Sequence, residues 1–252
     1  MLLIKTPEEI NHQRTLLKGS VGLIPTMGAL HEGHASLIEK AKSQCDHVVL
    51  SLFVNQVQFN NPDDFKKYPN TLEHDLILAK KLGVDLVFLP TKEVMYPDDY
   101  RYRLNEQEFS KLLCGKDRPG HFDGVLTVVM KLFQLIKPNY AYFGEKDYQQ
   151  LKLIQGMVEA FFLDVNIVPC KIIREKDGLA MSSRNLRLTP AQRDLAPKLY
   201  EIISTVKDLD SAYKQIEEQG FIIDYLEHDT NGRRYVAARL GDLRLIDNVL
   251  MV

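Results

Sequence analysis

Two histidines, His31 and His34, follow the apolar run Val21–Ile24 at the point where a strand is expected to hand over to a helix. Helix N-termini carry unpaired N–H groups that attract anions, and Gly28 and Gly33 permit a close backbone approach. The segment therefore predicts a polyphosphate site. The alternatives are that the histidines cap the helix or face solvent. A zinc site is disfavoured because no third ligand follows at short spacing.

A second polar cluster, Gly144-Glu145-Lys146-Asp147, follows the apolar residues that end at Phe143. Lys146 is suited to neutralise a phosphate, and Glu145 or Asp147 to help hold Mg²⁺. The simpler interpretation is a polar strand–helix turn in which Asp147 is the N-cap and Gln150 stands at N3. Spacing alone favours the simpler interpretation.

The third candidate is the loop Gly178–Asn185, which contains Ser182, Ser183 and Arg184. A glycine-bounded loop with two hydroxyls and a guanidinium can surround an anion. An ordinary linker has the same composition, so the loop is informative only together with the other two clusters.

The elements that must position these residues alternate along the chain. Apolar runs predict strands at Val21–Ile24, Val48–Val54, Val84–Leu89, Tyr140–Phe143 and Val165–Val168. Helical spacing of apolar residues predicts helices at Glu32–Ser43, Leu72–Leu82, Phe122–Ile136 and Leu151–Phe161, and a capping box formed by Thr6 and Glu9 starts an earlier one. This order predicts an α/β fold: a Rossmann-like parallel sheet with helices on both faces.

The pattern changes after about residue 175. A second capping box, formed by Thr189 and Gln192, opens one predicted helix lined by Leu195, Leu199, Ile202 and Val206. Two strands, Phe221–Glu227 and Tyr235–Leu240, are separated by a turn at Asp229–Gly232. We therefore expect a nucleotide-binding domain over residues 1–175 and a smaller α+β C-terminal domain over residues 176–252.

Composition narrows the function classes. The 252 residues carry a formal net charge of −2, whereas a dedicated nucleic-acid binder is usually basic. No apolar run is long enough for a membrane span, and the N-terminal segment is not a secretory signal. The three scattered cysteines predict neither a disulfide framework nor a zinc site. We expect a protein of a reducing compartment, the cytoplasm, with no nucleic-acid or membrane partner.

The joint occurrence of the His-x-Gly-His turn and the late Ser-Ser-Arg loop resembles adenylate-forming nucleotidyltransferases related to class I aminoacyl-tRNA synthetases. Within that superfamily the chain is similar to the pantothenate synthetase (pantoate–β-alanine ligase) family. The similarity lies in blocks that occur in family order: Ile24–His34, Ser51–Phe59, Tyr68–Asp75, His121–Phe133, Phe143–Leu151 and Arg174–Asn185, with Ala237–Gly241 and Leu245–Asn248 near the end.

The resemblance implies a role for each matching residue. The ATP contacts would be Met27, Gly28, Ala29, Leu30, His31, Glu32, Gly33, His34, Gly144, Glu145, Lys146, Asp147, Ile173, Met181, Ser182, Ser183 and Arg184. Gln58 and Gln150 would bind pantoate, with Gln58 also near β-alanine, and Tyr68 and Arg118 match positions near the site. The catalytic residues would be His34, the family's proton donor, with His31, Lys146 and Arg184.

The implied reaction joins pantoate to β-alanine in two steps. The pantoate carboxylate attacks the α-phosphate of ATP and expels pyrophosphate, and the β-alanine amine then attacks the pantoyl adenylate and releases AMP. Fixed donors and Mg²⁺, whose protein ligands the sequence leaves open, would stabilise the charge that develops. The resemblance also implies a homodimer, and a second domain that would close over the adenylate and exclude water.

Two alternatives and two departures from the family pattern remain. The alternatives are a cytidylyltransferase of the same superfamily and a non-catalytic RNA-binding relative. Gln56 stands where the family usually has proline, which affects the backbone leading to Gln58. The second domain is expected to be shorter than is usual, which affects its function as a lid.

Overall fold

The computed structural model describes residues 1–251; Val252, the last residue of the predicted second domain, lies outside that range. The chain forms two compact units. The first comprises Met1–Glu145 and Gln149–Cys170, and the second comprises Lys146–Tyr148 and the chain from Lys171 onward. The roles predicted for domains 1–175 and 176–252, nucleotide binding and a lid, stay predictions.

Among the described residues, six parallel strands form the sheet of the first unit, in the order β1-β4-β3-β2-β5-β6. They are β1 (Leu2–Ile4), β2 (Val21–Thr26), β3 (His47–Leu52), β4 (Leu86–Phe88), β5 (Tyr140–Gly144) and β6 (Asn166–Cys170). The predicted parallel sheet is confirmed. The edge strand β1 was not predicted, because three residues are too few to show a periodicity.

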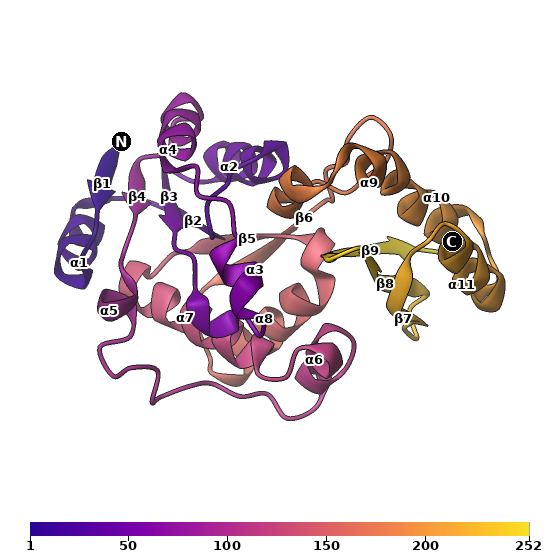
Figure 1. The fold of residues 1–252 in the computed structure, drawn as a ribbon. Coiled ribbons are helices and arrows are strands. Elements are labelled where there is room, and N and C mark those ends of the chain that lie inside the picture. Colours follow the sequence, from indigo (N-terminus) through magenta and orange to yellow (C-terminus); the bar gives the residue numbers. More distant parts are fainter. Residues whose placement is uncertain (252) are drawn as a thin grey trace. The chain divides into compact units, whose positions relative to one another are not determined.

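Helices cover both faces of this sheet. The helices of this part of the chain are α1 (Pro7–Leu16), α2 (Glu32–Gln44), α3 (Pro62–Lys66), α4 (Leu72–Lys81), α5 (Lys92–Met95), α6 (Cys114–Asp117), α7 (His121–Ile136) and α8 (Tyr148–Ala160), and the longer ones among them form the two layers. In Figure 1, α2 and α4 lie on one face, and α1, α7 and α8 lie on the other. The predicted capping box of Thr6 and Glu9 is present at the start of α1.

The strands near the centre of the sheet are apolar because both of their faces are covered. Every residue of β3 from Val48 to Leu52 is buried. Apolar side chains of β2, β3 and β4 form a cluster with those of α2 and α4, which includes Ile24, Ile38, Leu50, Ala79 and Val87. This packing holds the carboxyl ends of the strands in one rigid edge.

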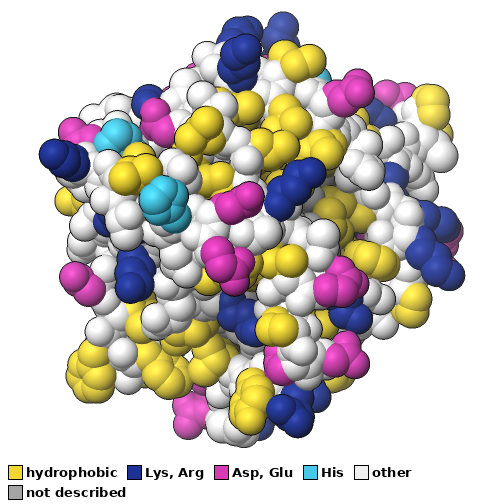
Figure 2. Space-filling view, turned by 90° about the vertical axis from the view of Figure 1, so that its left-hand side faces the viewer, with side chains coloured by type: hydrophobic (Ala, Val, Ile, Leu, Met, Phe, Trp, Pro, Cys, Tyr) yellow, Lys and Arg dark blue, Asp and Glu magenta, His cyan; other side chains and the backbone are white. Residues whose placement is uncertain are grey.

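The surface of the first unit mixes charges of both signs. On the face that carries β1, α1 and α5, lysine and arginine side chains alternate with aspartate and glutamate, and hydrophobic side chains are scattered between them (Figure 2). The described residues of this face therefore form no large patch of a single charge sign (Figure 2).

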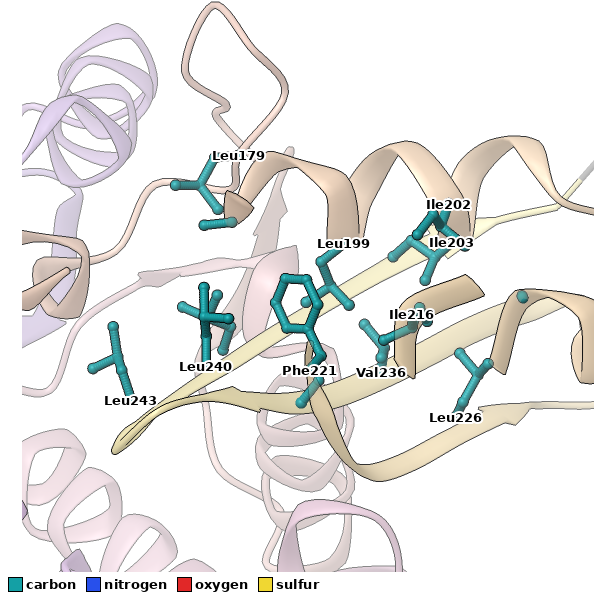
Figure 3. Close-up of a cluster of buried hydrophobic side chains, with 14 residues drawn as sticks. Leu179, Leu199, Ile202, Ile203, Ile216, Phe221, Leu226, Val236, Leu240 and Leu243 are labelled. Carbon is teal, nitrogen blue, oxygen red and sulfur yellow. The ribbon is translucent and has the colours of Figure 1, made fainter. Parts of the chain in front are cut away.

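The second unit contains, among its described residues, three antiparallel strands in the order β7-β8-β9. Its elements are α9 (Pro190–Leu195), α10 (Pro197–Thr205), α11 (Leu209–Glu218), β7 (Ile222–His228), β8 (Arg233–Leu240) and β9 (Leu243–Leu250). Leu199 and Ile203 of α10 and Ile216 of α11 pack toward Val236 and Leu240 of β8 (Figure 3). The predicted α+β character is confirmed.

Three details of this unit differ from the prediction. The single helix predicted after Thr189 is wrong: α9 ends before Ala196 and α10 begins at Pro197, which has no N–H to continue the first helix. The helix α11 and the strand β9 were not predicted as elements. Asp208, the N-cap of α11, is the local signal that marks the start of that helix.

No helix within residues 1–251 is both long enough and apolar enough to cross a bilayer.

Candidate functional site

The predicted residues of the first unit gather at one edge of its sheet. Thr26 of β2 pairs with Leu52 of β3, and Gly144 of β5 pairs with Cys170 of β6, so these strands end at the same edge. Strand order reverses between β2 and β5, which are neighbours. Ligands of open parallel sheets bind beyond the carboxyl ends of strands at such a reversal. A ligand is therefore expected to bind at the turns that follow β2, β3 and β5.

The two histidines cap helix α2. The backbone N–H of Gly33 donates to Nδ1 of His31 at 3.1 Å, and the N–H of His31 donates to Nδ1 of His34 at 3.4 Å. His31 is the N-cap residue, and the contact to Nδ1 of His34, together with one from the His34 backbone to the His31 side chain, forms a reciprocal capping box. The rings lie close together, with centroids 4.1 Å apart. The structure therefore confirms the alternative in which the histidines cap the helix.

Capping does not exclude a ligand role for the same rings. A ring nitrogen that accepts a hydrogen bond carries no proton, so each neutral imidazole holds its proton on Nε2. Nε2 is then a hydrogen-bond donor in both His31 and His34. The cap thus selects the tautomer that can donate to an anion at the positive end of α2.

The backbone between β2 and His31 is held by a buried carboxylate. Asp75 of α4, only 2% exposed, accepts hydrogen bonds from the N–H groups of Ala29 and Leu30, each at 2.8 Å. Gly28 and Ala29 both have positive φ, +79° and +49°, a region that favours glycine. A side chain at Gly28 would come within 3.0 Å of the Asp75 carboxylate. Asp75 therefore stabilises an otherwise strained turn that leads to the histidines.

Gln58 lies after β3 and is nearly buried, at 9% exposure. It ends a 3-10 helix, Gln56–Gln58, and its Nε2 donates to Sδ of Met27 at 3.2 Å. Gln56, at the family's proline position, is the exposed first residue of this turn. The first N–H of such a turn has no internal partner, so proline and glutamine are both accommodated there. The structure thus places Gln58 beside Met27 of the predicted nucleotide segment.

The neighbouring residues Gln149 and Gln150 in α8 differ in their partners. Gln149 is buried, accepts from the N–H of Cys114 and donates to the carbonyls of Phe109 and Leu112, so it is a structural residue. Within residues 1–251, the half-buried side chain of Gln150 makes no hydrogen bond. Gln150 therefore keeps its amide for other partners, as a ligand-binding role requires.

A 3-10 turn, Glu145–Asp147, joins β5 directly to α8. Asp147 is thus inside a helical turn, and the interpretation of Asp147 as an N-cap is wrong, since an N-cap has a non-helical backbone. In the second unit, Lys146 and Asp147 form an ion pair at 3.7 Å, and the Lys146 carbonyl accepts from Nδ2 of Asn248 at 3.0 Å. The backbone of Lys146 is therefore anchored to β9.

The loop of the second unit that contains Met181–Arg184 is also well anchored. The N–H of Met181 donates to the carbonyl of Ile173, and the Ser182 hydroxyl accepts from the N–H of Arg184. The preceding Arg174 forms a bidentate ion pair with the buried Asp247, at 2.6 and 2.9 Å. A flexible linker would lack such hydrogen bonds and such an ion pair, so the loop has a defined conformation.

A thiolate and a cluster of metal ligands are two other kinds of reactive group that the edge of the sheet could have carried. Burial raises the pKa of the Cys170 thiol to about 11, so this residue at the end of β6 supplies no thiolate near neutral pH. In the part of the chain that the structure describes, no group of three or more histidine, cysteine, aspartate or glutamate residues is placed to hold a metal ion. Mg²⁺ commonly binds through substrate phosphates and one or two carboxylates, which needs no such group.

Asp75 was not predicted as a functional residue. It lies one helical turn before the buried Ala79, on the covered face of α4. A charged residue in an apolar stripe is the signal that marks it, since buried charges are almost always paired.

Comparison with known proteins agrees with the family resemblance seen in the sequence. The sequence matches the family model described as Pantoate-beta-alanine ligase over residues 2–250. The pantothenate synthetase of Bdellovibrio bacteriovorus is 55% identical over 247 residues, which cover 98% of this chain and 98% of that protein.

Two solved structures share the fold over nearly their whole length. The pantoate-beta-alanine ligase of Francisella tularensis, complexed with beta-gamma ATP and beta-alanine, has a TM-score of 0.95 and 43% identity, and the match covers 99% of this chain and 97% of that one. The pantothenate synthetase of Thermus thermophilus has a TM-score of 0.92 and 39% identity, with 99% of both chains covered. The expectation that the second domain is shorter than is usual for the family stays a prediction.

Proposed function

Because the chain belongs to the pantoate-beta-alanine ligase family, we propose that it condenses pantoate with β-alanine in an ATP-dependent reaction that releases AMP and pyrophosphate. The reaction runs through a pantoyl adenylate. The observation that carries this proposal is the turn after β2, where a capped helix end presents two histidines in the donor tautomer. The ligase of F. tularensis was solved with beta-gamma ATP and beta-alanine, which correspond to two of the three substrates of this reaction, the nucleotide and the amine.

The nucleotide contacts in this proposal come from four segments. They are Met27–His34, Gly144–Asp147, Ile173 and Met181–Arg184. When pantoate attacks the α-phosphate, negative charge grows on the transferring phosphoryl group and on pyrophosphate. Donors that are already in place stabilise this charge without reorganisation. We assign that role to Nε2 of His31 and His34, to Lys146 and to Arg184, with His34 as the proton donor.

Gln58 and Gln150 are the proposed pantoate ligands. Gln58 is buried beside Met27, and the Gln150 amide makes no hydrogen bond within residues 1–251. Two amides suit the carboxylate and hydroxyl groups of pantoate. Gln58 also lies near the β-alanine amine in this proposal, and positioning of that amine replaces a dedicated base.

Three further features belong to the proposal. Mg²⁺ would lie on the phosphates of ATP, with Glu145 or Asp147 as a carboxylate ligand; the Asp147 side chain is 47% exposed and can reach an ion. The protein would be a homodimer, as the family resemblance implies. It would work in the cytoplasm, which agrees with the three cysteines, all free in the described chain.

The test is exchange of labelled pyrophosphate into ATP. We expect exchange that depends on pantoate and Mg²⁺ and does not need β-alanine, since the adenylate forms first. Exchange that appears only with β-alanine would refute the two-step order. A higher rate with cytidine triphosphate than with ATP would favour a cytidylyltransferase. Size-exclusion chromatography with light-scattering detection gives the mass of the protein in solution, and a monomer mass near 28.9 kDa would refute the dimer.

A further inference from the structure

The side chain of Gln58 is oriented by a buried network in the first unit. Its Oε1 accepts a hydrogen bond from Nδ2 of Asn55 at 3.0 Å, and Asn55 is 1% exposed. The same Nδ2 donates to the carbonyl of Gly124 at 3.1 Å, and Oδ1 of Asn55 accepts from the Tyr96 hydroxyl at 2.9 Å. Every polar group of the Asn55 amide therefore has a partner.

The backbone of Gln58 is held just as closely. Its carbonyl accepts from Nδ1 of His121 at 2.8 Å and from the Arg118 guanidinium at 3.3 Å. A Cβ at Gly124 would come within 2.8 Å of the Gln58 backbone, so only glycine allows α7 to approach this turn. Because the backbone is fixed, the remaining freedom of Gln58 is the direction of its amide.

The network decides that direction. A carboxamide presents an oxygen acceptor on one side and an NH₂ donor on the other. The Tyr96 hydroxyl donates to Oδ1 of Asn55, so Nδ2 must face Gln58 and occupy its Oε1. Gln58 is left with Nε2, whose partner among the described residues is the weak acceptor Sδ of Met27. An incoming carboxylate or hydroxyl oxygen is a stronger acceptor and would displace that contact.

The environment of Tyr96 keeps its hydroxyl protonated, so that it remains a hydrogen-bond donor. Tyr96 is 3% exposed, and burial raises the pKa of its hydroxyl well above the usual value, so it stays protonated. Nζ of Lys131 lies 4.9 Å from the centre of its ring, and the ring of Tyr100 packs edge-on at 5.3 Å. Its ring position is therefore fixed by packing rather than by the hydroxyl.

We propose that Tyr96 is a positioning residue for pantoate: acting through Asn55, its hydroxyl sets the Gln58 amide so that the N–H donors face the substrate. The inference rests on the proposed role of Gln58 in binding pantoate. Tyr96 itself does not contact the substrate. The distinction matters because its effect must disappear when the Gln58 amide is absent.

The experiment is a double-mutant cycle of Tyr96→Phe and Gln58→Ala, read as pantoate affinity with a non-hydrolysable ATP analogue present. Tyr96→Phe alone should weaken pantoate by about tenfold, since a buried acceptor loses its donor. In the Gln58→Ala background the further loss should be under about twofold, because residues in one network are not additive. Affinity for the ATP analogue should stay unchanged in both.

The matched control is Tyr142→Phe. Tyr142 is also fully buried in the first unit, and its hydroxyl donates to Gln44 at the last residue of α2. That end is about 20 Å from the histidine turn for a helix of 13 residues. Tyr142→Phe should lower Tm as much as Tyr96→Phe does and leave pantoate affinity unchanged.

Three outcomes would overturn the proposal: normal pantoate affinity in Tyr96→Phe, additive losses in the cycle, or an equal loss of pantoate and ATP-analogue affinity. A second readout works without substrate. In the labelled free protein, Tyr96→Phe should shift the NMR signals of the Gln58 side-chain amide, and unchanged signals would also refute the role. Wild-type protein that binds no pantoate would instead refute the proposed function, whatever the NMR result.

Discussion

Replacing Asp75 by asparagine tests whether a buried carboxylate sets the histidine turn. In the native protein Oδ2 accepts from the N–H of Ala29, and Oδ1 accepts from the N–H of Leu30 and the Thr71 hydroxyl. Asparagine has one acceptor oxygen, so its NH₂ group would face the N–H of Ala29 or Leu30. That leaves a buried donor unpaired and removes a hydrogen bond to a charged group, which together cost about 2–3 kcal/mol.

The size of the effect can be measured in two ways. A loss of about 2 kcal/mol lowers Tm by about 4–8 °C in a protein of this size. If the turn relaxes and displaces His31 and His34, the pantoate-dependent exchange rate should fall by about a hundredfold, since a shift of about 1 Å can have that effect. Exchange is measured at saturating ATP and pantoate, and Tm by thermal denaturation.

The control is Thr71→Val, which removes only the hydroxyl contact to Asp75; Thr71 makes no side-chain cap of α4. It should lower stability by about 1 kcal/mol or less and leave exchange near normal. Asp75→Asn with wild-type Tm and exchange would refute the reasoning. Equal losses in the two variants would show that the backbone contacts of Ala29 and Leu30 are not what matters.

Four further predictions concern single residues. His31→Asn keeps a good N-cap acceptor but removes the Nε2 donor, so Tm should stay within a few degrees while exchange falls about a hundredfold; full exchange would leave capping as the whole role. Lys146→Ala should slow adenylation by a similar factor, about a hundredfold, with β9 and the fold intact by circular dichroism; normal exchange at saturating ATP would remove Lys146 from the reaction. Gln150→Glu places a favourable charge at the start of α8, so Tm should hold or rise while pantoate affinity falls; normal turnover would refute the substrate role. The pKa of His228 is lowered by partial desolvation of its ring and by Arg234, whose Nε donates to Nε2 of His228 at 2.6 Å. The unfolded chain therefore binds a proton at His228 more readily than the folded chain does. The contribution of His228 to stability should be constant above about pH 6.5 and fall as the pH drops below it. In His228→Gln, which keeps an acceptor and does not titrate, the drop in Tm from about pH 7.5 to about pH 5 should be smaller; an equal drop would contradict this assignment.

Much of the fold could be predicted from local patterns. Strands covered on both faces must be continuously apolar, and amphipathic helices must repeat at helical spacing, so β2 to β6 and the helices α2, α4, α7 and α8 were all visible. Proline and the capping boxes also act locally, which is why the starts of α1 and α9 were predicted correctly. The break at Pro197 was missed because the apolar spacing of the helix was followed past the proline. The strand β9 was missed because the strand assignment stopped at Leu240.

The candidate residues also fall into two groups: those that could be recognised from the sequence and those whose role appears only in the structure. Their types and order along the chain, His31, His34, Gln58, Lys146 and the Ser-Ser-Arg loop, were sufficient to indicate a family and its chemistry. Only the tertiary structure placed Asp75 under the histidine turn and Tyr96 behind Asn55, partners that are 41 to 46 residues apart in sequence. Such contacts have no periodicity, because they depend on which helix packs over which strand end. A side chain's identity is written in the sequence, but the direction of its hydrogen bonds is decided by its neighbours in space.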